Sequence, residues 1–320
     1  MSNTVEKLIL AAPRGYCAGV DRAVQTVERA LEIHGAPVYV RKEIVHNKHV
    51  VESLRERGAI FVDEHTEVPK GAVCVFSAHG VAPSVHAGAA ERGLRTIDAT
   101  CPLVTKVHRE ALRFAEEGYT IVLVGHEGHE EVEGTMGEAP ERIVLVQSER
   151  DVEELEVEDP GRVAYVTQTT LAVDETAAIL ARLRERFPSI VGPRTDDICY
   201  ATTNRQTAVK QMSGGCDLVL VIGSRNSSNS VRLVEVARDC GTDAHLIDNA
   251  SEIQERWLEG TRIVGVSSGA SAPENLVANL VDFFRARGVE DISEFEVVSE
   301  DVRFMLPKQI REAVAAGEAS

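Results

Sequence analysis

The sequence predicts an α/β protein that contains three copies of one unit, and three observations lead to this fold class. Short runs of β-branched and aliphatic residues alternate with longer stretches in which apolar residues recur every three or four positions, a pattern typical of parallel sheets flanked by helices. Cys17, Cys101 and Cys199 recur at intervals of 84 and 98 residues, and each follows a short apolar run and precedes a helix-like segment. Each thiol is therefore expected where the carboxyl end of a strand meets the start of a helix. Polar residues after other apolar runs recur with nearly the same period.

The first two copies are expected to form domains at residues 15–100 and 101–197. In the first, the pattern predicts strands near 37–45, 59–63 and 72–77 and helices near 18–34 and 47–57. In the second, it predicts strands near 120–125, 142–147 and 162–167 and helices near 102–117, 130–138 and 173–187.

The third domain is expected at residues 198–288, together with an N-terminal strand within residues 1–14. Its predicted strands lie near 217–223, 244–248 and 262–267, and its helices near 202–213, 229–240 and 274–287. The opening strand LILAAP has no partner in the first copy, so we expect it to pair with the last. Residues 289–320 form a charged C-terminal tail, in which VRFMLPKQIREAV predicts a strand end and a short helix.

Composition limits the function classes. The net charge of −17, from 34 Lys and Arg against 51 Asp and Glu, opposes non-specific binding to nucleic acid or to an anionic membrane. No apolar run approaches the roughly 18 residues of a membrane span, and the N-terminus has no basic leader, so we expect a cytoplasmic protein. In that reducing compartment we expect Cys74, Cys216 and Cys240 to be passive, buried packing residues.

The three periodic cysteines are candidate metal ligands. A thiol at a helix N-terminus has a lowered pKa, and Pro102 directly after Cys101 suits the first helical position. Three cysteines without close pairs match structural zinc poorly, whereas an iron-sulfur cluster accepts ligands distant in sequence, and three of them leave one iron of a four-iron cluster open. The alternative is three unconnected buried cysteines, which the shared register disfavours.

Two sets of polar residues follow the predicted strands. His46, His129 and Ser227 begin one set, at intervals of 83 and 98 residues, and the other set is His79, Thr169 and Ser271, at intervals of 90 and 102. Ligands of parallel α/β sheets bind beyond the carboxyl ends of the strands, so these residues predict a pocket for an anion such as a phosphate or diphosphate. Each residue taken singly could instead be an ordinary turn or helix cap.

Glu131 is the carboxylate in these segments that could act as an acid, because burial beside a cluster would raise its pKa. The alternative is a helix-start carboxylate favoured by the helix dipole. The sequence leaves both interpretations open.

Nine ordered segments between about residues 8 and 275 together resemble one family, the 4-hydroxy-3-methylbut-2-enyl diphosphate reductases, also called IspH or LytB. These segments are RGYCAGVDRAV, EIVHN, SAHG, DATCPLVTKVH, GHEGHEEVEGTMG, VTQTTL, DDICYATTNRQ, GSRNSSNS and SSGASAPE. One departure is Glu130, where many members have proline, and we expect it to change local backbone and charge but not the roles of its neighbours.

The resemblance implies a trefoil of three α/β domains around a central four-iron four-sulfur cluster held by Cys17, Cys101 and Cys199. It implies that the diphosphate is bound by His46, His79, His129, Ser227, Ser228, Asn229 and Ser271. It also implies catalytic roles for Glu131 in proton supply, for Thr169 near the substrate hydroxyl, and for His129. The implied reaction is reductive dehydroxylation to isopentenyl and dimethylallyl diphosphates, with a ferredoxin or flavodoxin as electron donor.

Two other classes remain as alternatives. One is a non-enzymatic iron-sulfur sensor, which often acts on DNA and is disfavoured by the lack of a basic face. The other is a zinc hydrolase with Cys and His ligands. Visible absorption separates a cluster from zinc, and substrate consumption separates an enzyme from a sensor.

Overall fold

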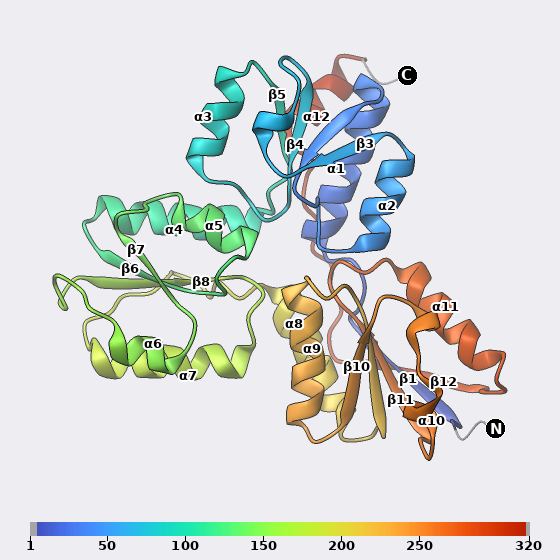
Figure 1. Ribbon diagram of the computed structural model, residues 1–320. Coiled ribbons are helices and arrows are strands. Elements are labelled where there is room, and N and C mark those ends of the chain that lie inside the picture. The colour runs from blue at the N-terminus through green and yellow to red at the C-terminus, as the bar shows by residue number, and fades with distance from the viewer. Residues whose placement is uncertain (1–4, 318–320) are drawn as a thin grey trace. The chain divides into compact units, whose positions relative to one another are not determined.

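The computed structural model describes residues 5–317, whose strands form three parallel sheets. These residues divide into two compact units (Figure 1). The first unit comprises residues 5–18, 46–50 and 200–303, and the second comprises 19–45, 51–199 and 304–317. The prediction of parallel α/β sheets is confirmed.

The first unit contains a five-stranded sheet in the order β10-β9-β11-β1-β12. Its strands are β1 (Lys7–Ala12), β9 (Leu218–Ile222), β10 (Asp243–Ile247), β11 (Ile263–Ser268) and β12 (Asp291–Glu296). Leu8 of β1 lies opposite Val264 of β11 on one side and Ile292 of β12 on the other. The prediction that the opening strand pairs with the last copy is therefore confirmed, whereas β12 lies in a segment that was expected to be a tail.

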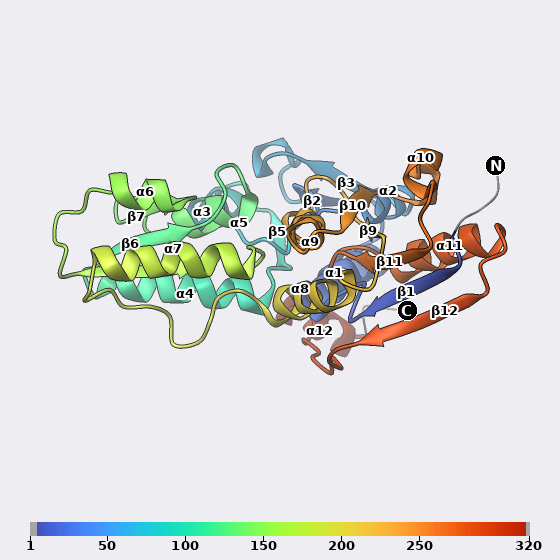
Figure 2. The ribbon, with the colours of Figure 1, turned by 90° about the horizontal axis from the view of Figure 1, so that it is seen from below.

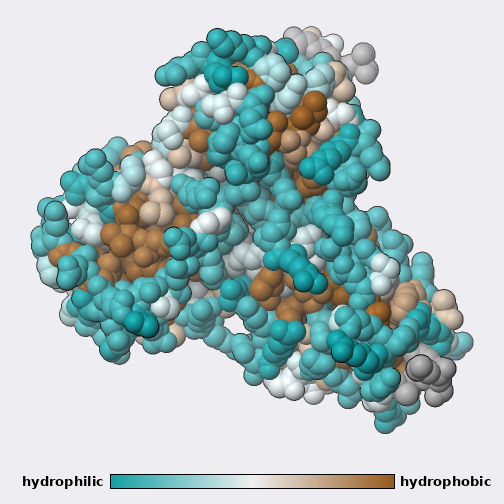
Figure 3. All heavy atoms as spheres, viewed as in Figure 1, coloured by the Kyte–Doolittle hydropathy of each residue, from teal (hydrophilic) through white to brown (hydrophobic). Residues whose placement is uncertain are grey.

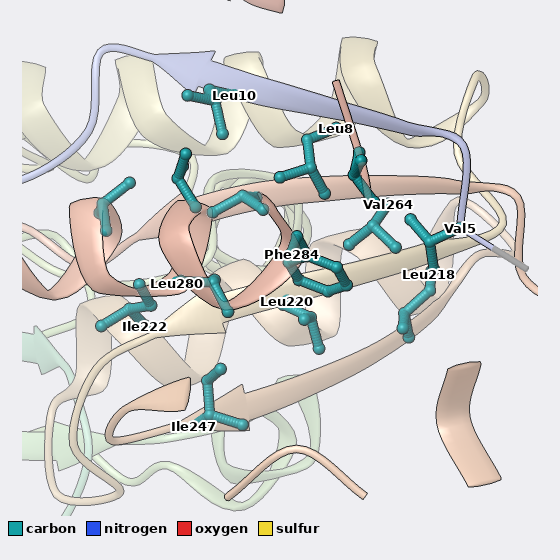
Figure 4. Close-up of a cluster of buried hydrophobic side chains, with 14 of the residues drawn as sticks. Val5, Leu8, Leu10, Leu218, Leu220, Ile222, Ile247, Val264, Leu280 and Phe284 are labelled. Atoms are coloured by element: carbon teal, nitrogen blue, oxygen red, sulfur yellow. The ribbon is translucent and has the colours of Figure 1, made fainter. Parts of the chain in front are cut away.

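Helices cover both faces of this sheet, as a central strand buried on both sides requires. Leu218, Leu220 and Ile222 of β9 point toward α11 (Glu274–Arg285), where they meet Leu280 and Phe284 (Figure 4). The alternate residues of β9 pack on the other face against α8 (Tyr200–Ser213) and α9 (Ser228–Asp239). Two short helical segments, η2 (Ala250–Glu252) and α10 (Glu255–Leu258), complete the unit.

The second unit contains two sheets, in the orders β3-β2-β4-β5 and β7-β6-β8. The strands of the first are β2 (Val38–Arg41), β3 (Ala59–Val62), β4 (Val73–Phe76) and β5 (Arg95–Asp98). The strands of the second are β6 (Thr120–Val124), β7 (Ile143–Val146) and β8 (Val163–Thr167). The helices between Ala18 and Glu91 are α1 (Ala18–His34), α2 (Lys48–Glu56), η1 (His65–Glu67) and α3 (Pro83–Glu91).

The β7-β6-β8 sheet shows the same two-sided packing. Its helices are α4 (Pro102–Glu116), α5 (Glu130–Met136), α6 (Glu149–Glu154) and α7 (Val173–Arg186). In Figures 1 and 2, α4 and α5 lie on one face and α6 and α7 on the other. Ile121 and Leu123 of β6 pack toward α4 and α5, and Val122 and Val124 pack toward α6 and α7.

The surface in view is mostly hydrophilic, with apolar residues gathered over β6 and β7 (Figure 3). Val144 lies on the edge strand β7 and is 38% exposed, so this edge of the sheet is incompletely covered. Among the helices of residues 5–317, none has the length and apolar character needed to cross a membrane.

All three sheets repeat one strand order. In each copy the first strand lies between the second and the third, and the third lies beside the chain segment that leads to a cysteine. That segment is β5 before Cys101 and β1 before Cys17. Before Cys199 the expected strand is absent: Val191 forms a single bridge to Ala164, and the chain then leaves the sheet. Gly192 and Pro193 explain the difference, because proline has no N–H to continue the ladder.

Other expectations need correction. The pattern did not predict α3, α6 or α10, and residues 301–306 form no strand, although α12 (Lys308–Ala315) confirms the short helix expected near the C-terminus. Cys74 lies fully buried in β4, as expected, and Cys216 is half-buried. Cys240 is exposed, contrary to prediction, because it is the C-cap residue of α9 and lies beyond the helix's buried face.

Candidate functional site

The expected polar residues lie just beyond the carboxyl ends of the first and third strands of each copy. His46 follows β2 and His79 follows β4, while His129 follows β6 and Thr169 follows β8. In the remaining sheet, β9 leads to Ser227, Ser228 and Asn229, and β11 leads to Ser271. Helices α2, α5 and α9 begin at these segments, so their N-terminal N–H groups add anion-binding capacity.

The three periodic cysteines share one backbone contact. The N–H of Cys17 donates to Ala270 O at 3.1 Å, that of Cys101 to Ala78 O at 3.0 Å, and that of Cys199 to Thr169 O at 3.0 Å. Each acceptor lies in the loop after the third strand of a copy, namely β11, β4 or β8. A helix begins directly after each cysteine, with α1, α4 and α8 starting at Ala18, Pro102 and Tyr200. The repeat seen in sequence is therefore also a repeat of local geometry.

The other cysteines differ in environment. Burial raises the pKa of the Cys74 thiol to about 11, and burial also raises that of Cys216 to about 11. Such thiols remain protonated at neutral pH and ligate metal poorly. Cys17, Cys101 and Cys199 are all partly exposed, as Cys216 is, whereas Cys74 is fully buried.

Within the first unit, the structure brings His46, Ser271 and Asn229 together through the loop after β11. Ser271 Oγ donates to the backbone carbonyl of His46 at 2.9 Å, and Asn229 Oδ1 accepts the N–H of Ala270 at 2.8 Å. Ser227 caps α9, because its hydroxyl accepts the N–H of Ser230 at 3.3 Å. Hydroxyl, amide and imidazole groups thus line these strand ends.

Within the second unit, Glu131 and Thr169 form a buried pair. Glu131 Oε1 accepts the Thr169 N–H at 2.6 Å, and Oε2 accepts the Thr169 hydroxyl at 3.0 Å. Burial raises the pKa of Glu131 to about 7, although the bonds from Thr169 and the charge of His108 oppose the rise. Glu131 also lies in the first turn of α5, so it is a helix-start residue as well as a buried acid.

His129 supports this geometry from the adjoining position. It is the N-cap residue of α5, and its Nδ1 accepts the backbone N–H of Glu131 at 3.1 Å. This bond requires Nδ1 to be unprotonated, so in the neutral ring the proton lies on Nε2. His129 can then donate from Nε2 to an anion.

Glu130 contacts one of the candidate binding residues. Its carboxylate lies 3.1 Å from His79 Nδ1 and accepts the Ser77 hydroxyl at 3.3 Å. The rings of His79 and His129 meet edge to face with centroids 5.8 Å apart. The family departure at Glu130 therefore falls beside His79, which places a carboxylate next to a histidine expected to bind an anion.

The sequence interpretation did not single out Asp197, whose carboxylate is fully buried. Its Oδ2 accepts the Thr167 N–H at 2.9 Å, and its Oδ1 accepts Lys106 Nζ at 3.0 Å. The available signal was an Asp-Asp pair two residues before Cys199, in a segment that the pattern assigned to a strand.

The fold is that of an α/β protein with three parallel sheets, whose strand ends carry polar residues and whose helix starts carry the periodic cysteines, features typical of enzymes for small anionic molecules. The chain belongs to the LytB protein family, whose model matches residues 8–285.

Curated relatives agree with this assignment. A protein of Nocardia farcinica named 4-hydroxy-3-methylbut-2-enyl diphosphate reductase is 61% identical over 311 residues, covering 97% of this chain and 93% of the relative. A protein of the same name from Rhodococcus opacus is 60% identical, covering 96% of this chain and 92% of the relative.

Solved structures agree on the fold. The structure of E-1-hydroxy-2-methyl-but-2-enyl-4-diphosphate reductase from Plasmodium falciparum has a TM-score of 0.95 and 37% identity, covering 98% of this chain and 99% of that one. A second structure, of (E)-4-hydroxy-3-methyl-but-2-enyl diphosphate reductase, the terminal enzyme of the non-mevalonate pathway, has a TM-score of 0.62 and 31% identity, covering 88% and 100%.

Proposed function

We propose that this protein is a 4-hydroxy-3-methylbut-2-enyl diphosphate reductase. The reaction removes the allylic hydroxyl of the substrate as water, consumes two electrons and two protons, and yields isopentenyl or dimethylallyl diphosphate. The family membership and the names of the relatives support the reaction. The observation on the molecule that carries the proposal is the buried Glu131–Thr169 pair, which supplies an acid with a pKa near neutrality.

An iron-sulfur cluster is the cofactor that the cysteines fit. Cys17, Cys101 and Cys199 each lie directly before a helix and make the same backbone contact. Thiolates are the ligands that such clusters require. The high pKa of Cys74 and Cys216 makes those residues unsuitable. We propose that the three periodic cysteines hold a four-iron four-sulfur cluster with one open iron. When bound, the cluster supplies electrons singly and a Lewis-acidic iron for the substrate hydroxyl.

The diphosphate is proposed to bind at the strand ends. Neutral and histidine donors after parallel strands, reinforced by helix N-terminal N–H groups, suit a multiply charged anion. The proposed set is His46, His79, His129, Ser227, Ser228, Asn229 and Ser271. Fixing the charged end in this way holds the reacting end in one orientation, and we expect positioning to supply much of the rate enhancement.

Glu131 is proposed to deliver the proton that leaves with the hydroxyl. Because its pKa is about 7, a large fraction carries a proton at neutral pH, unlike an ordinary glutamate. Thr169 holds the carboxyl in place through two hydrogen bonds, and its hydroxyl is proposed to lie near the substrate hydroxyl. His129 fixes the helix turn that carries Glu131, so the three residues form one proton-delivery group.

The electrons are proposed to come from a small redox protein such as a ferredoxin or flavodoxin, and the protein is proposed to act in the cytoplasm. The test is anaerobic reconstitution with iron and sulfide, followed by visible spectroscopy and assay with a chemical reductant. Broad visible absorption with conversion of the substrate supports the reductase. A colourless protein that holds zinc favours a hydrolase, and an intact cluster without conversion favours a sensor.

A further inference from the structure

Each helix that follows a periodic cysteine carries one basic residue near its start. Arg22 and Lys106 stand five residues after Cys17 and Cys101, and Arg205 stands six residues after Cys199. All three side chains donate to backbone carbonyls in the segment just before another of these cysteines. These contacts follow a cyclic order along the chain. The basic side chain of the first helix contacts the segment before the second cysteine, that of the second helix contacts the segment before the third cysteine, and that of the third helix contacts the segment before the first cysteine.

Lys106 makes the most extensive of these contacts. Its Nζ donates to the carbonyl of Thr195, to that of Asp196 at 2.8 Å, and to Asp197 Oδ1 at 3.0 Å. The other oxygen of Asp197 accepts the N–H of Thr167 at the end of β8. Residues 195–197 therefore lie between α4 and β8, held on both sides, and they lead directly to Cys199.

The Lys106 contact lies in the segment before Cys199, where the other two copies have a strand before their cysteines. Cys17 and Cys101 follow β1 and β5, whose ladders fix the incoming chain, whereas the chain leaves the sheet after Val191 on its way to Cys199. An ammonium group with three oxygen partners can fix three consecutive residues without a ladder. The fully buried carboxylate of Asp197 would be costly without such a partner.

Arg22 and Arg205 repeat the arrangement with guanidinium groups. Arg22 Nη1 donates to the carbonyls of Ala99 and Thr100, both at 2.9 Å, directly before Cys101. Arg205 Nη2 donates to the carbonyl of Gly15 at 2.7 Å, two residues before Cys17, and its Nη1 lies 3.2 Å from the Glu300 carboxylate. Arg205 is completely buried, and these partners fix the orientation of its guanidinium group.

We propose that Arg22, Lys106 and Arg205 are positioning residues that hold the backbone at the three periodic cysteines in the conformation that binds the cluster. The inference rests on the proposed function, because it assumes that these cysteines are the ligands. Each basic residue orders the backbone on the N-terminal side of a cysteine, while the shared N–H contact orders the cysteine itself. A thiolate fixed in this way loses less conformational freedom when it ligates the metal.

The test compares Lys106→Met and Arg22→Met with wild type and with Arg29→Met. Arg29 is a matched control, because it lies on α1 like Arg22 but is 53% exposed and forms an ion pair within its own helix, with Glu32. After anaerobic reconstitution, iron content and the rate of iron transfer to a ferrous chelator are measured. We expect release to be about 10- to 100-fold faster in both variants, the range typical of lost outer-shell partners of a metal site, and unchanged in Arg29→Met. Arg22→Lys should restore part of the retention.

A second measurement needs no metal. Hydrogen–deuterium exchange of the metal-free protein should be faster at residues 193–199 in Lys106→Met, with no change at β6. If Lys106→Met does not fold, Asp197→Asn takes its place with the same expectation. Wild-type iron release together with wild-type exchange in folded variants would overturn the positioning role. Failure of the wild-type protein itself to bind iron would instead overturn the proposed function, and exchange would still report on the contact.

Discussion

Glu131 and Thr169 are joined by two hydrogen bonds, one to each oxygen of the carboxyl group, at 2.6 and 3.0 Å. Glu131 lies at the start of α5, which follows β6, and Thr169 lies just beyond β8. The pair therefore links the segments that follow two neighbouring strands, β6 and β8. The carbonyl of Thr169 also accepts the N–H of Cys199. The proposed acid and one proposed cluster ligand are therefore tied to the same residue.

Replacing Glu131 with glutamine should remove the acidic proton and keep one of the two acceptor atoms that Thr169 contacts. We expect turnover to fall at least about 100-fold, because general acid catalysis typically contributes 10²- to 10⁴-fold. Iron content and substrate affinity should stay close to wild type. Steady-state kinetics and iron analysis of Glu131→Gln check this, and near-normal turnover would remove Glu131 from the mechanism.

The raised pKa of Glu131 also predicts a pH dependence of stability. The folded-state pKa of about 7 lies above the ordinary value of 4.5, so the native state holds this proton more tightly than the unfolded chain. Its stabilising contribution is full below about pH 4.5 and is lost as pH rises through 7, a change of about 3 kcal/mol for this residue.

Urea unfolding of the metal-free wild type and Glu131→Gln at pH 5 and pH 8 measures this term. Glutamine mimics the protonated acid at every pH, so the variant should gain stability relative to wild type as pH rises. An equal difference in unfolding free energy at the two pH values would show that Glu131 does not titrate in this range.

Cys101→Ser should abolish turnover and lose iron, because serine is a poor ligand for the cluster. Cys240→Ser is the matched control, since Cys240 is an exposed helix-cap residue outside the proposed site. Iron and sulfide analysis with visible absorption distinguishes the two variants. A Cys101→Ser protein with full iron content and activity would refute the ligand assignment.

Ser227→Ala should affect both stability and binding. Loss of the α9 cap should lower the free energy of unfolding by about 1 kcal/mol, and loss of a diphosphate donor should raise KM. Ser228→Ala removes a neighbouring hydroxyl that is not the cap, so it should raise KM with a smaller change in Tm. Thermal unfolding and kinetics of both variants check this, and an unchanged KM in both would exclude these serines from binding.

Much of the fold was predictable because the strands carry clear signals. The LVLVI run of β9 is buried at every position, and such a run flanked by helical periodicity indicates a central parallel strand. The cysteine period fixed the repeat, since each cysteine lies at a helix start. Strand β12 was not predicted, because its sequence DISEFE contains three acidic residues, which are rare in strands, and because it lies at the sheet edge.

The contacts within the site were less predictable. A lysine or arginine on a helix usually reads as a solvent-facing residue, so the periodicity gave no sign that Lys106 and Arg205 bind backbone carbonyls. The pairing of Glu130 with His79 depends on tertiary contact between segments 51 residues apart. Sequence identified which residues lie at strand ends, whereas their partners depend on how the loops fold.

The most direct test is anaerobic turnover of 4-hydroxy-3-methylbut-2-enyl diphosphate by the reconstituted protein with a chemical reductant, using Cys101→Ser as the negative control. The wild-type protein should convert the substrate to isopentenyl and dimethylallyl diphosphates, and the control should form neither. Absence of both products from a wild-type protein with an intact cluster would contradict the proposed function.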